Sequence, residues 1–345
     1  MVRARHNPRK GSIAYRPRVR ARKQTPSFRS FPIGEGPTKP LNFFGYKAGM
    51  VHVLAQSQHP KGRRQNMDIQ IPTTVIECPP LQVWGVRAYT KNAYGLHAHG
   101  ELTVDKLEKG AQKRIPSFKK KYPHKRNTEK KTVSREKLTF EQLDTQKEAL
   151  HCLRLLVHTH PEKVGFGKKK AEIAEVALSG TVEEQLAYAK EKMGKTIAVS
   201  EIFEANEDVD VRAVTRGFGF GGVVARFGVK TFRPKAKYIR AVGSISPLRP
   251  KTVMFTVARP GQLGYHNRTE FNKRILTISD DAKKINPKSG FMHYGVIQNE
   301  YMLLAGSVPG PVKRLIGLRT CVRPQPRNDY RIGNITITSS TAGAV

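Results

Sequence analysis

Short apolar runs, broken by glycine, proline and charged residues, recur along the chain and predict strands. Runs rich in β-branched and aromatic residues occur first at Val51–Leu54, Thr73–Cys78 and Gln82–Tyr89, with Pro79-Pro80 before the last of them. Many short strands with this punctuation favour a closed or partly closed β-barrel. The later predicted strands are Leu153–Val157, Ile197–Phe203, Val253–Val257, Gly290–Ile297, Tyr301–Ala305 and Leu315–Val322, with a hairpin turn at Gln298-Asn299-Glu300.

Residues 95–194 have a different pattern, which includes helices. Leu138–Leu150 has helical composition, and Thr181-Val182-Glu183-Glu184 is a capping-box signature at a helix N-terminus. Val182, Leu186, Ala189 and Met193 then fall on one helical face, and Gly194 supplies a C-terminal stop. The predicted fold class is therefore mainly β with an α/β insertion. Trp84, the single tryptophan, is expected in the core.

Charge changes this picture most at Val211–Thr269, which is 59 residues long and contains no acidic side chain. The whole chain carries 62 Lys and Arg against 27 Asp and Glu, a formal charge of +35. Such an excess indicates a polyanionic partner, of which nucleic acid is the commonest. A membrane is disfavoured, because no apolar run approaches the roughly 18–20 residues of a spanning helix. The acidic stretch Glu201–Asp210, just before this basic segment, is expected to face solvent or to pair with a basic loop of the same protein.

The N-terminal residues form a second basic segment. Residues 1–34 contain ten Lys or Arg and no acid. In an extended chain, the alternation of Arg16, Arg18, Arg20 and Arg22 places successive guanidinium groups about 6–7 Å apart on one side. Such an arm can follow a phosphate backbone, and we favour this interpretation over a tail that only adds solubility. For the basic run Lys109–Lys137 the sequence does not decide between two interpretations, a second basic binding face and a solvated surface segment.

Cysteines and histidines give no strong metal signal. Three cysteines, far apart and odd in number, fit free buried thiols in a reducing compartment. His158-x-His160 could supply two ligands, but a metal site needs a third and a fourth. We interpret these histidines as polar strand positions or RNA contacts, and predict no metal site.

The glycine-rich motif Gly217-x-Gly219-x-x-Gly222 matches the dinucleotide-binding fingerprint only by letter. Val223–Phe227 is expected to be a strand where that fingerprint needs a helix, and no Asp or Glu follows before Glu270. We interpret the motif as a turn that lets backbone approach RNA, with Phe218 and Phe220 available to stack on bases or to pack into the core. No catalytic set is present, since the adjacent Asp280-Asp281 fits a turn, so no enzyme is predicted. The alternative is a nucleic-acid-processing enzyme that uses the glycine-rich segment.

Several motifs together carry a resemblance to a known family. The run Val214–Gly222 resembles the glycine-rich signature of the universal large-subunit ribosomal protein number three, and so does Gly261–Lys273. Phe44–Met50, Val75–Pro80 and Gly306–Arg314 extend the match, in order, over nearly the whole chain. Length and the inserted region are similar to the archaeal branch of the family.

The resemblance implies a translation-protein-type β-barrel seated on large-subunit (23S-type) rRNA, with a role in early subunit assembly. It implies a discontinuous barrel core at residues 41–94 and 195–330, and an α/β insertion at 95–194. A basic N-terminal extension at 1–40 and a basic loop at 223–251, reaching toward the peptidyl transferase centre, would enter the rRNA. A C-terminal tail covers 331–345.

The resemblance also implies partners and contact residues. Partners are large-subunit rRNA and neighbouring ribosomal proteins in the cytoplasmic ribosome, without a membrane, a small-molecule substrate or a cofactor other than structural Mg²⁺ of the rRNA. Leu248 stands where many archaeal relatives carry a tryptophan near the loop tip. The residues expected to bind rRNA are Arg16, Arg18, Arg20, Arg22, Arg216, Arg226, Lys230, Arg233, Lys235, Lys237, Arg240, Leu248, Arg249, Lys251, Arg259, His266, Arg268, Lys273, Lys313 and Arg314.

Overall fold

The chain forms two compact units of mainly β structure. The computed structural model describes residues 15–32, 37–57, 67–115, 139–246, 249, 251–324 and 330–336. One unit, here called the arm–hairpin unit, is Met1–Gln24 with Val214–Arg268. The other, the sheet unit, is Thr25–Ala213 with Thr269–Val345. Leu248 and most of the basic run 109–137 lie outside the described residues, as do parts of the N-terminal extension and of the C-terminal tail.

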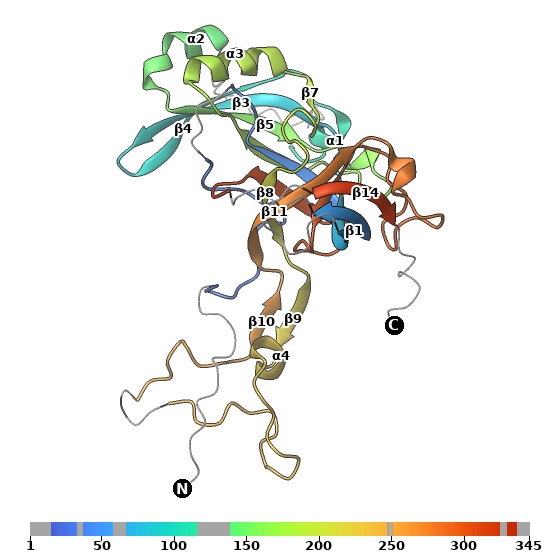
Figure 1. Ribbon diagram of the computed structural model, residues 1–345. Coiled ribbons are helices and arrows are strands. Elements are labelled where there is room, and N and C mark those ends of the chain that lie inside the picture. Colours follow the sequence, from blue (N-terminus) through green and yellow to red (C-terminus); the bar gives the residue numbers. More distant parts are fainter. Residues whose placement is uncertain are drawn as a thin grey trace, which may run out of the picture. The chain divides into compact units, whose positions relative to one another are not determined.

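The elements follow one another as Figure 1 labels them. The strands are β1 (Asn42–Ser57), β2 (Asp68–Glu77), β3 (Leu81–Asn92), β4 (Gly95–Thr103), β5 (Cys152–His158), β6 (Ile173–Ala177), β7 (Thr196–Ile197), β8 (Asp208–Val214), β9 (Gly217–Gly221), β10 (Gly261–Gly264), β11 (Asn267–Ser279), β12 (Tyr301–Ala305), β13 (Leu315–Thr320) and β14 (Tyr330–Thr336). The α-helices are α1 (Lys109–Gln112), α2 (Phe140–Thr145), α3 (Val182–Lys192) and α4 (Val223–Phe227), and the 3₁₀ turns are η2 (Lys147–Ala149), η3 (Pro161–Lys163) and η4 (Ala282–Lys284). In the described ranges, no helix combines the length and the apolar content needed to cross a membrane.

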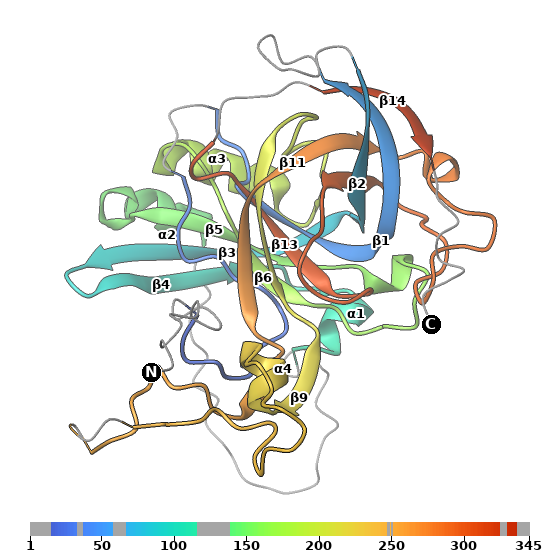
Figure 2. The same cartoon turned by 60° about the horizontal axis from the view of Figure 1, so that its bottom comes forward.

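A seven-stranded sheet forms the largest part of the sheet unit. Its strand order is β13-β8-β11-β12-β2-β1-β14, and β13 also pairs with β1. Figure 2 shows β2, β1 and β14 running side by side. The long β1 has three partners because β2 pairs along one of its edges, while β13 and β14 pair with its first and last residues along the other. Its register with β2 shifts between Lys47 and Gly49. Apolar side chains of these strands, such as Phe43 and Val75, are fully buried in one core.

A five-stranded sheet is the second sheet of this unit. Its order is β4-β3-β5-β6, with β7 pairing β3, and α2 and α3 cover one face of it (Figure 1). The predicted barrel segment 41–94 thus contributes β1 and β2 to one sheet and β3 to the other. Trp84 of β3 is only 7% exposed and packs in a small satellite cluster with Leu107 and Leu156, so its predicted core position is confirmed.

Helix α3 begins and ends where the sequence predicted. The Thr181 hydroxyl accepts from the Glu184 amide, and the Glu184 carboxylate accepts from the Thr181 amide, so the capping box is present. Such a cap stabilises a helix by about 1 kcal/mol. Leu186 and Ala189 are buried, and Gly194 takes a positive φ of 75° just beyond the last turn.

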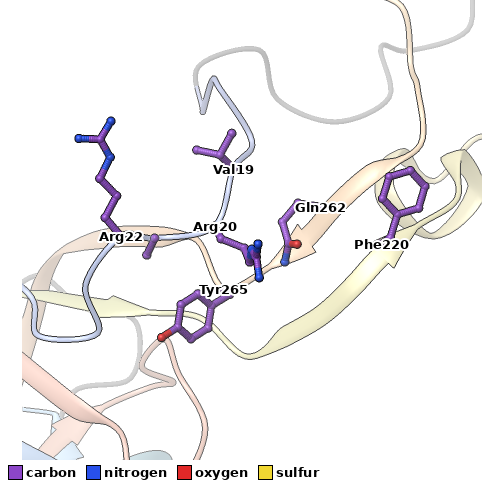
Figure 3. Close-up of a pocket in the computed structure, with 7 residues that line it drawn as sticks. Val19, Arg20, Arg22, Phe220, Gln262 and Tyr265 are labelled. Carbon is purple, nitrogen blue, oxygen red and sulfur yellow. The ribbon is translucent and has the colours of Figure 1, made fainter.

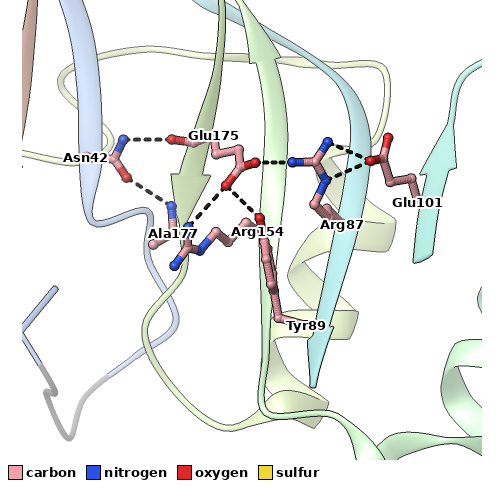
Figure 4. Close-up of polar contacts among 7 residues, drawn as sticks. All are labelled: Asn42, Arg87, Tyr89, Glu101, Arg154, Glu175 and Ala177. Carbon is pink, nitrogen blue, oxygen red and sulfur yellow. Dashed lines mark hydrogen bonds and ion pairs between the residues drawn. The ribbon is translucent and has the colours of Figure 1, made fainter. Parts of the chain in front are cut away.

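A charged network ties β6 to its neighbours (Figure 4). The Glu175 carboxylate accepts from the Tyr89 hydroxyl at 2.9 Å and from Arg154 Nη1 at 3.1 Å, and it also pairs with Arg87. Asn42 of β1 donates to the Glu175 carbonyl at 3.0 Å and accepts from the Ala177 amide at 2.9 Å. The two sheets of the unit are therefore joined by directional hydrogen bonds as well as by apolar contact.

Three predictions in the sheet unit were wrong or too long. Gly290–Ile297 is a compact turn, because Gly295 has a φ of 106°. The apolar side chains of this segment enter the core from a loop and not from a strand. Residues 298–300 form no hairpin: the amides of Gln298 and Asn299 both donate to the buried Glu77 carboxylate at 3.0 Å. Of Ile197–Phe203 only Ile197 is in a strand, since turn hydrogen bonds to Val199 follow.

The acidic stretch before the basic segment does not simply face solvent. Asp210 in β8 is fully buried and pairs with Arg319 of β13. It also accepts from the amides of Asn272 and Val322 at 3.2 and 3.4 Å. The expectation of a solvated or loop-paired stretch is therefore wrong at Asp210, where burial is offset by a cation and two amides.

Candidate nucleic-acid interface

A glycine-rich antiparallel hairpin forms the centre of the arm–hairpin unit. Strand β9 pairs with β10, with Phe220 opposite Gln262 and Gly217 opposite Gly264. Gly264 has a φ of 71°, and a Cβ there would lie 2.1 Å from the Arg216 carbonyl oxygen, so only glycine fits. Phe218 and Phe220 are 65% and 80% exposed. The predicted turn is therefore strand β9, and of the two positions expected for the phenylalanines the structure has the exposed one.

The segment after β9 corrects a prediction. Val223–Phe227 is the short helix α4, not a strand, since Gly222 begins it in extended conformation and Gly228 ends it with a φ of 64°. Val223 and Phe227 are buried on its inner side. Although a helix now follows the glycines, β9 lies in an antiparallel hairpin and not in a βαβ unit, so the setting of a dinucleotide site is still missing.

Another predicted strand of this unit, Val253–Val257, is a turn. The Val257 amide donates to the Met254 carbonyl at 3.1 Å, which closes the chain on itself. Met254 and Phe255 are 50% and 61% exposed. The β-branched composition was misleading here, because these side chains have no sheet to pack on.

Arg226 holds the base of the hairpin together. Its guanidinium donates to the carbonyls of Gln262 at 3.0 Å, Arg259 at 2.8 Å and Arg18 at 3.3 Å. Burial, together with the positive charge of Arg16, lowers its pKa below the ordinary arginine value. The structure thus places this predicted rRNA ligand inward, where it fixes three stretches of backbone.

The described part of the N-terminal arm lies along this hairpin. The Ala21 amide donates to the Tyr265 carbonyl at 2.8 Å, and Nδ1 of the buried His266 donates to the Val19 carbonyl at 2.9 Å. Arg18 lies over the Phe227 ring at 4.1 Å, a cation–π contact. His266 and Arg18, both predicted to bind rRNA, are therefore used to attach the arm.

The arm and hairpin enclose an open pocket of about 660 Å³. Its lining combines two cationic side chains, Arg20 and Arg22, with the rings of Phe220 and Tyr265. Figure 3 shows Arg20 beside Gln262 and the Tyr265 ring, while Phe220 comes from the opposite strand. Exposed cations near aromatic faces are what a phosphate and its unstacked base require. Sequence reasoning selected Arg20, Arg22 and Phe220 but missed Tyr265, whose only sequence signal was its place in the Gly261–Lys273 motif.

The other predicted cations of this unit point to solvent. The unit's sequence ranges contain no Asp or Glu, so no acid within the unit can neutralise them. Arg268 lies over the Tyr15 ring at 4.2 Å and Arg16 over the Phe255 ring at 4.8 Å. The exposed side chains are Arg16, Arg20, Arg22, Arg216, Lys230, Arg233, Lys235, Lys237, Arg240, Arg249, Lys251 and Arg259.

Three predicted rRNA ligands belong to the sheet unit instead. Lys273 is paired with Glu270 at 2.9 Å, and Lys313 is exposed on a turn with a φ of 69°. Arg314 is buried, at 8% exposure. Arg314 is therefore not available at the surface of this unit, whereas Lys313 is.

The cysteines and histidines also have defined environments. Cys78, Cys152 and Cys321 are free thiols, as predicted. His158 and His160 are buried and lie close to Glu108. Their burial excludes the interpretation of these two histidines as surface RNA contacts.

Comparison with known proteins gives a consistent family match. The model of the family described as "Ribosomal protein L3" matches residues 1–337. The large ribosomal subunit protein uL3 of Methanocaldococcus jannaschii is 42% identical over 343 residues, covering 98% of this chain and 97% of the relative. The protein of the same name from Archaeoglobus fulgidus is 39% identical over 341 residues, with 98% of each chain covered.

Proposed function

Because the chain belongs to the ribosomal protein L3 family, we propose that it is a structural constituent of the large ribosomal subunit that binds large-subunit rRNA through its arm–hairpin unit. Its place is the large subunit of the cytoplasmic ribosome, its partners are rRNA and neighbouring ribosomal proteins, and it has no catalytic role. The observation that carries the proposal is the pocket in which Arg20 and Arg22 lie with Phe220 and Tyr265, within a unit free of acidic residues.

Two kinds of contact would bind rRNA at this pocket, ionic contacts to phosphates and stacking on bases. The guanidinium groups of Arg20 and Arg22 would contact phosphates, which fixes position but not sequence. The exposed ring of Phe220 and the half-buried ring of Tyr265 would stack on unpaired bases. The basic loop at residues 223–251 would then carry Arg233, Lys235 and Lys237 along the rRNA toward the peptidyl transferase centre.

The sheet unit would supply the rigid support for this contact. Since β13 pairs with both β8 and β1, the strands β1, β13, β8, β11, β12 and β2 would form a closed barrel of the translation-protein type. In this arrangement the barrel core would draw its strands from residues 42–77 and 208–320, within the expected segments 41–94 and 195–330, while β3 joins the sheet of the α/β insertion at 95–194. Residues 1–40 would be the basic extension, and residues 331–336 of the expected tail 331–345 pair with β1 as part of β14. Binding to rRNA would require no cofactor beyond Mg²⁺ that belongs to the rRNA.

Replacing Phe220 with alanine is expected to weaken binding to large-subunit rRNA fragments by about 5- to 150-fold, the range of one lost base–aromatic stack. The variant should fold normally, because the ring is 80% exposed. Filter binding at fixed salt measures the effect. The matched control is Tyr94→Ala, which removes a 94% exposed ring outside the arm–hairpin unit. Equal affinity of Phe220→Ala and the unmodified protein, or an equal loss in Tyr94→Ala, would rule out stacking at this pocket.

A further inference from the structure

Three side chains of types that ligate metals converge in the sheet unit, which is not the unit of the candidate nucleic-acid interface. They are Glu108, just before α1, His158, the last residue of β5, and His160, just before η3. One ligand atom from each lies within 4.8 Å of the others. Glu108 Oε2 is 3.2 Å from His160 Nδ1. The two imidazole rings pack edge to face, with their centroids 4.9 Å apart.

Burial makes this cluster unusual. His158 and His160 are 1% and 2% exposed, and among the described residues the Nε2 atom of each has no hydrogen-bond partner. A buried polar atom without a partner costs about 1–3 kcal/mol, so two adjacent ones need a reason. Edge-to-face packing of the rings satisfies neither nitrogen.

The third side chain is already in place beside the imidazoles. The Glu108 carboxylate is 47% exposed and makes no capping hydrogen bond to α1, and its Oε2 atom faces the rings, 3.2 Å from His160 Nδ1.

We propose that Glu108, His158 and His160 bind one divalent transition-metal ion, preferably Zn²⁺, with water as the fourth ligand. Two His and one carboxylate are an established zinc donor set, with bonds of about 2.0–2.2 Å. Tetrahedral ligands at that distance lie about 3.3 Å apart, and the ligand atoms here lie within 4.8 Å of one another, so the side chains would close on the ion by rotation. Two imidazole nitrogens among three donors disfavour Mg²⁺ and Ca²⁺, which take oxygen ligands.

The position of the cluster gives the ion a structural role. It would join the start of α1 to the end of β5, beside the satellite cluster that contains Leu107, Ala111 and Leu156. Helix α1 is only four residues long and is too short to be stable without tertiary support. A metal tie at Glu108 would supply that support.

Cobalt titration of the full-length chain tests the site. The protein is kept soluble at high salt, stripped with a chelator and titrated with Co²⁺. The expected result is one Co²⁺ per chain with the visible absorption of a four-coordinate ion, displaced by Zn²⁺. The double variant His158→Ala/His160→Ala should lose this absorption. Glu108→Gln, which alters an exposed side chain, should weaken binding at least tenfold, because even groups that only orient a ligand have that effect.

The matched control is His97→Ala/His99→Ala, which removes two histidines of the same spacing from exposed positions on β4. It should bind Co²⁺ as the unmodified protein does. Circular dichroism checks the fold of every variant. If the double variant fails to fold, two other measurements test the site. They are the Co²⁺ affinity of Glu108→Gln and a Zn²⁺-dependent rise in the melting temperature of the unmodified chain. Stoichiometric binding that survives Glu108→Gln, or a folded unmodified chain that binds no Co²⁺, would overturn the proposal.

Discussion

Raising the salt concentration from 50 to 200 mM is expected to weaken binding to large-subunit rRNA by about 10⁴- to 10⁵-fold. If ten of the exposed cations contact phosphates, the plot of log affinity against log salt should have a slope of roughly −7 to −9, since each contact releases a condensed counterion. The arm–hairpin unit offers that many cations on a surface without an acid. Filter binding at four or more salt concentrations gives the slope.

Individual residues can be assigned to that slope. Replacing Lys235 and Lys237 together with glutamine should reduce its magnitude by about 2, one for each lost phosphate contact. Lys283→Gln is the control, because Lys283 is an exposed lysine of the sheet unit. A slope near zero, or equal slopes for the loop variant and the unmodified chain, would contradict an electrostatic contact through the loop.

Removing the Asp210 carboxylate is expected to destabilise the sheet unit by about 3–5 kcal/mol. Asp210→Ala leaves the guanidinium of Arg319, which is 5% exposed, without its anion, and an uncompensated buried charge costs this much. It also removes the acceptor of the Asn272 and Val322 amides. Urea unfolding followed by tryptophan fluorescence of Trp84 measures the change.

The control for this substitution is Asp280→Ala, at an exposed carboxylate on the turn after β11. It should change the free energy of unfolding by no more than about 0.5 kcal/mol. If the two variants lost the same free energy of unfolding, the buried pair would contribute no more to stability than an exposed carboxylate does.

Much of the sheet unit could be predicted from local pattern. The capping box at Thr181 and the apolar face of α3 are short-range signals, and the structure has both. Positions that depend on distant partners could not be predicted. Gln298 and Asn299 are held by Glu77, more than 220 residues earlier, and Asp210 is buried because Arg319 lies beside it.

The candidate interface was predicted in outline but not in detail. Absence of acids identified the arm and the glycine-rich segment, since charge density is visible in the sequence. Charge alone could not separate contact residues from structural ones: Arg226 and His266 face inward and bind backbone carbonyls. Similarly, the sequence offered only His158 and His160 as possible ligands and we predicted no metal site, since Glu108, fifty residues earlier, becomes their neighbour only in the folded chain.

The central claim is that this chain is a structural, rRNA-bound component of the large subunit, and sedimentation of a lysate in a sucrose gradient tests it most directly. The protein is followed with an antibody at low salt and at about 1 M salt, where electrostatic contacts are largely screened. The expected result is that all of the protein travels with the large subunit at low salt and leaves it only at high salt. Protein that stays at the top of the low-salt gradient, apart from the subunit, would contradict the account.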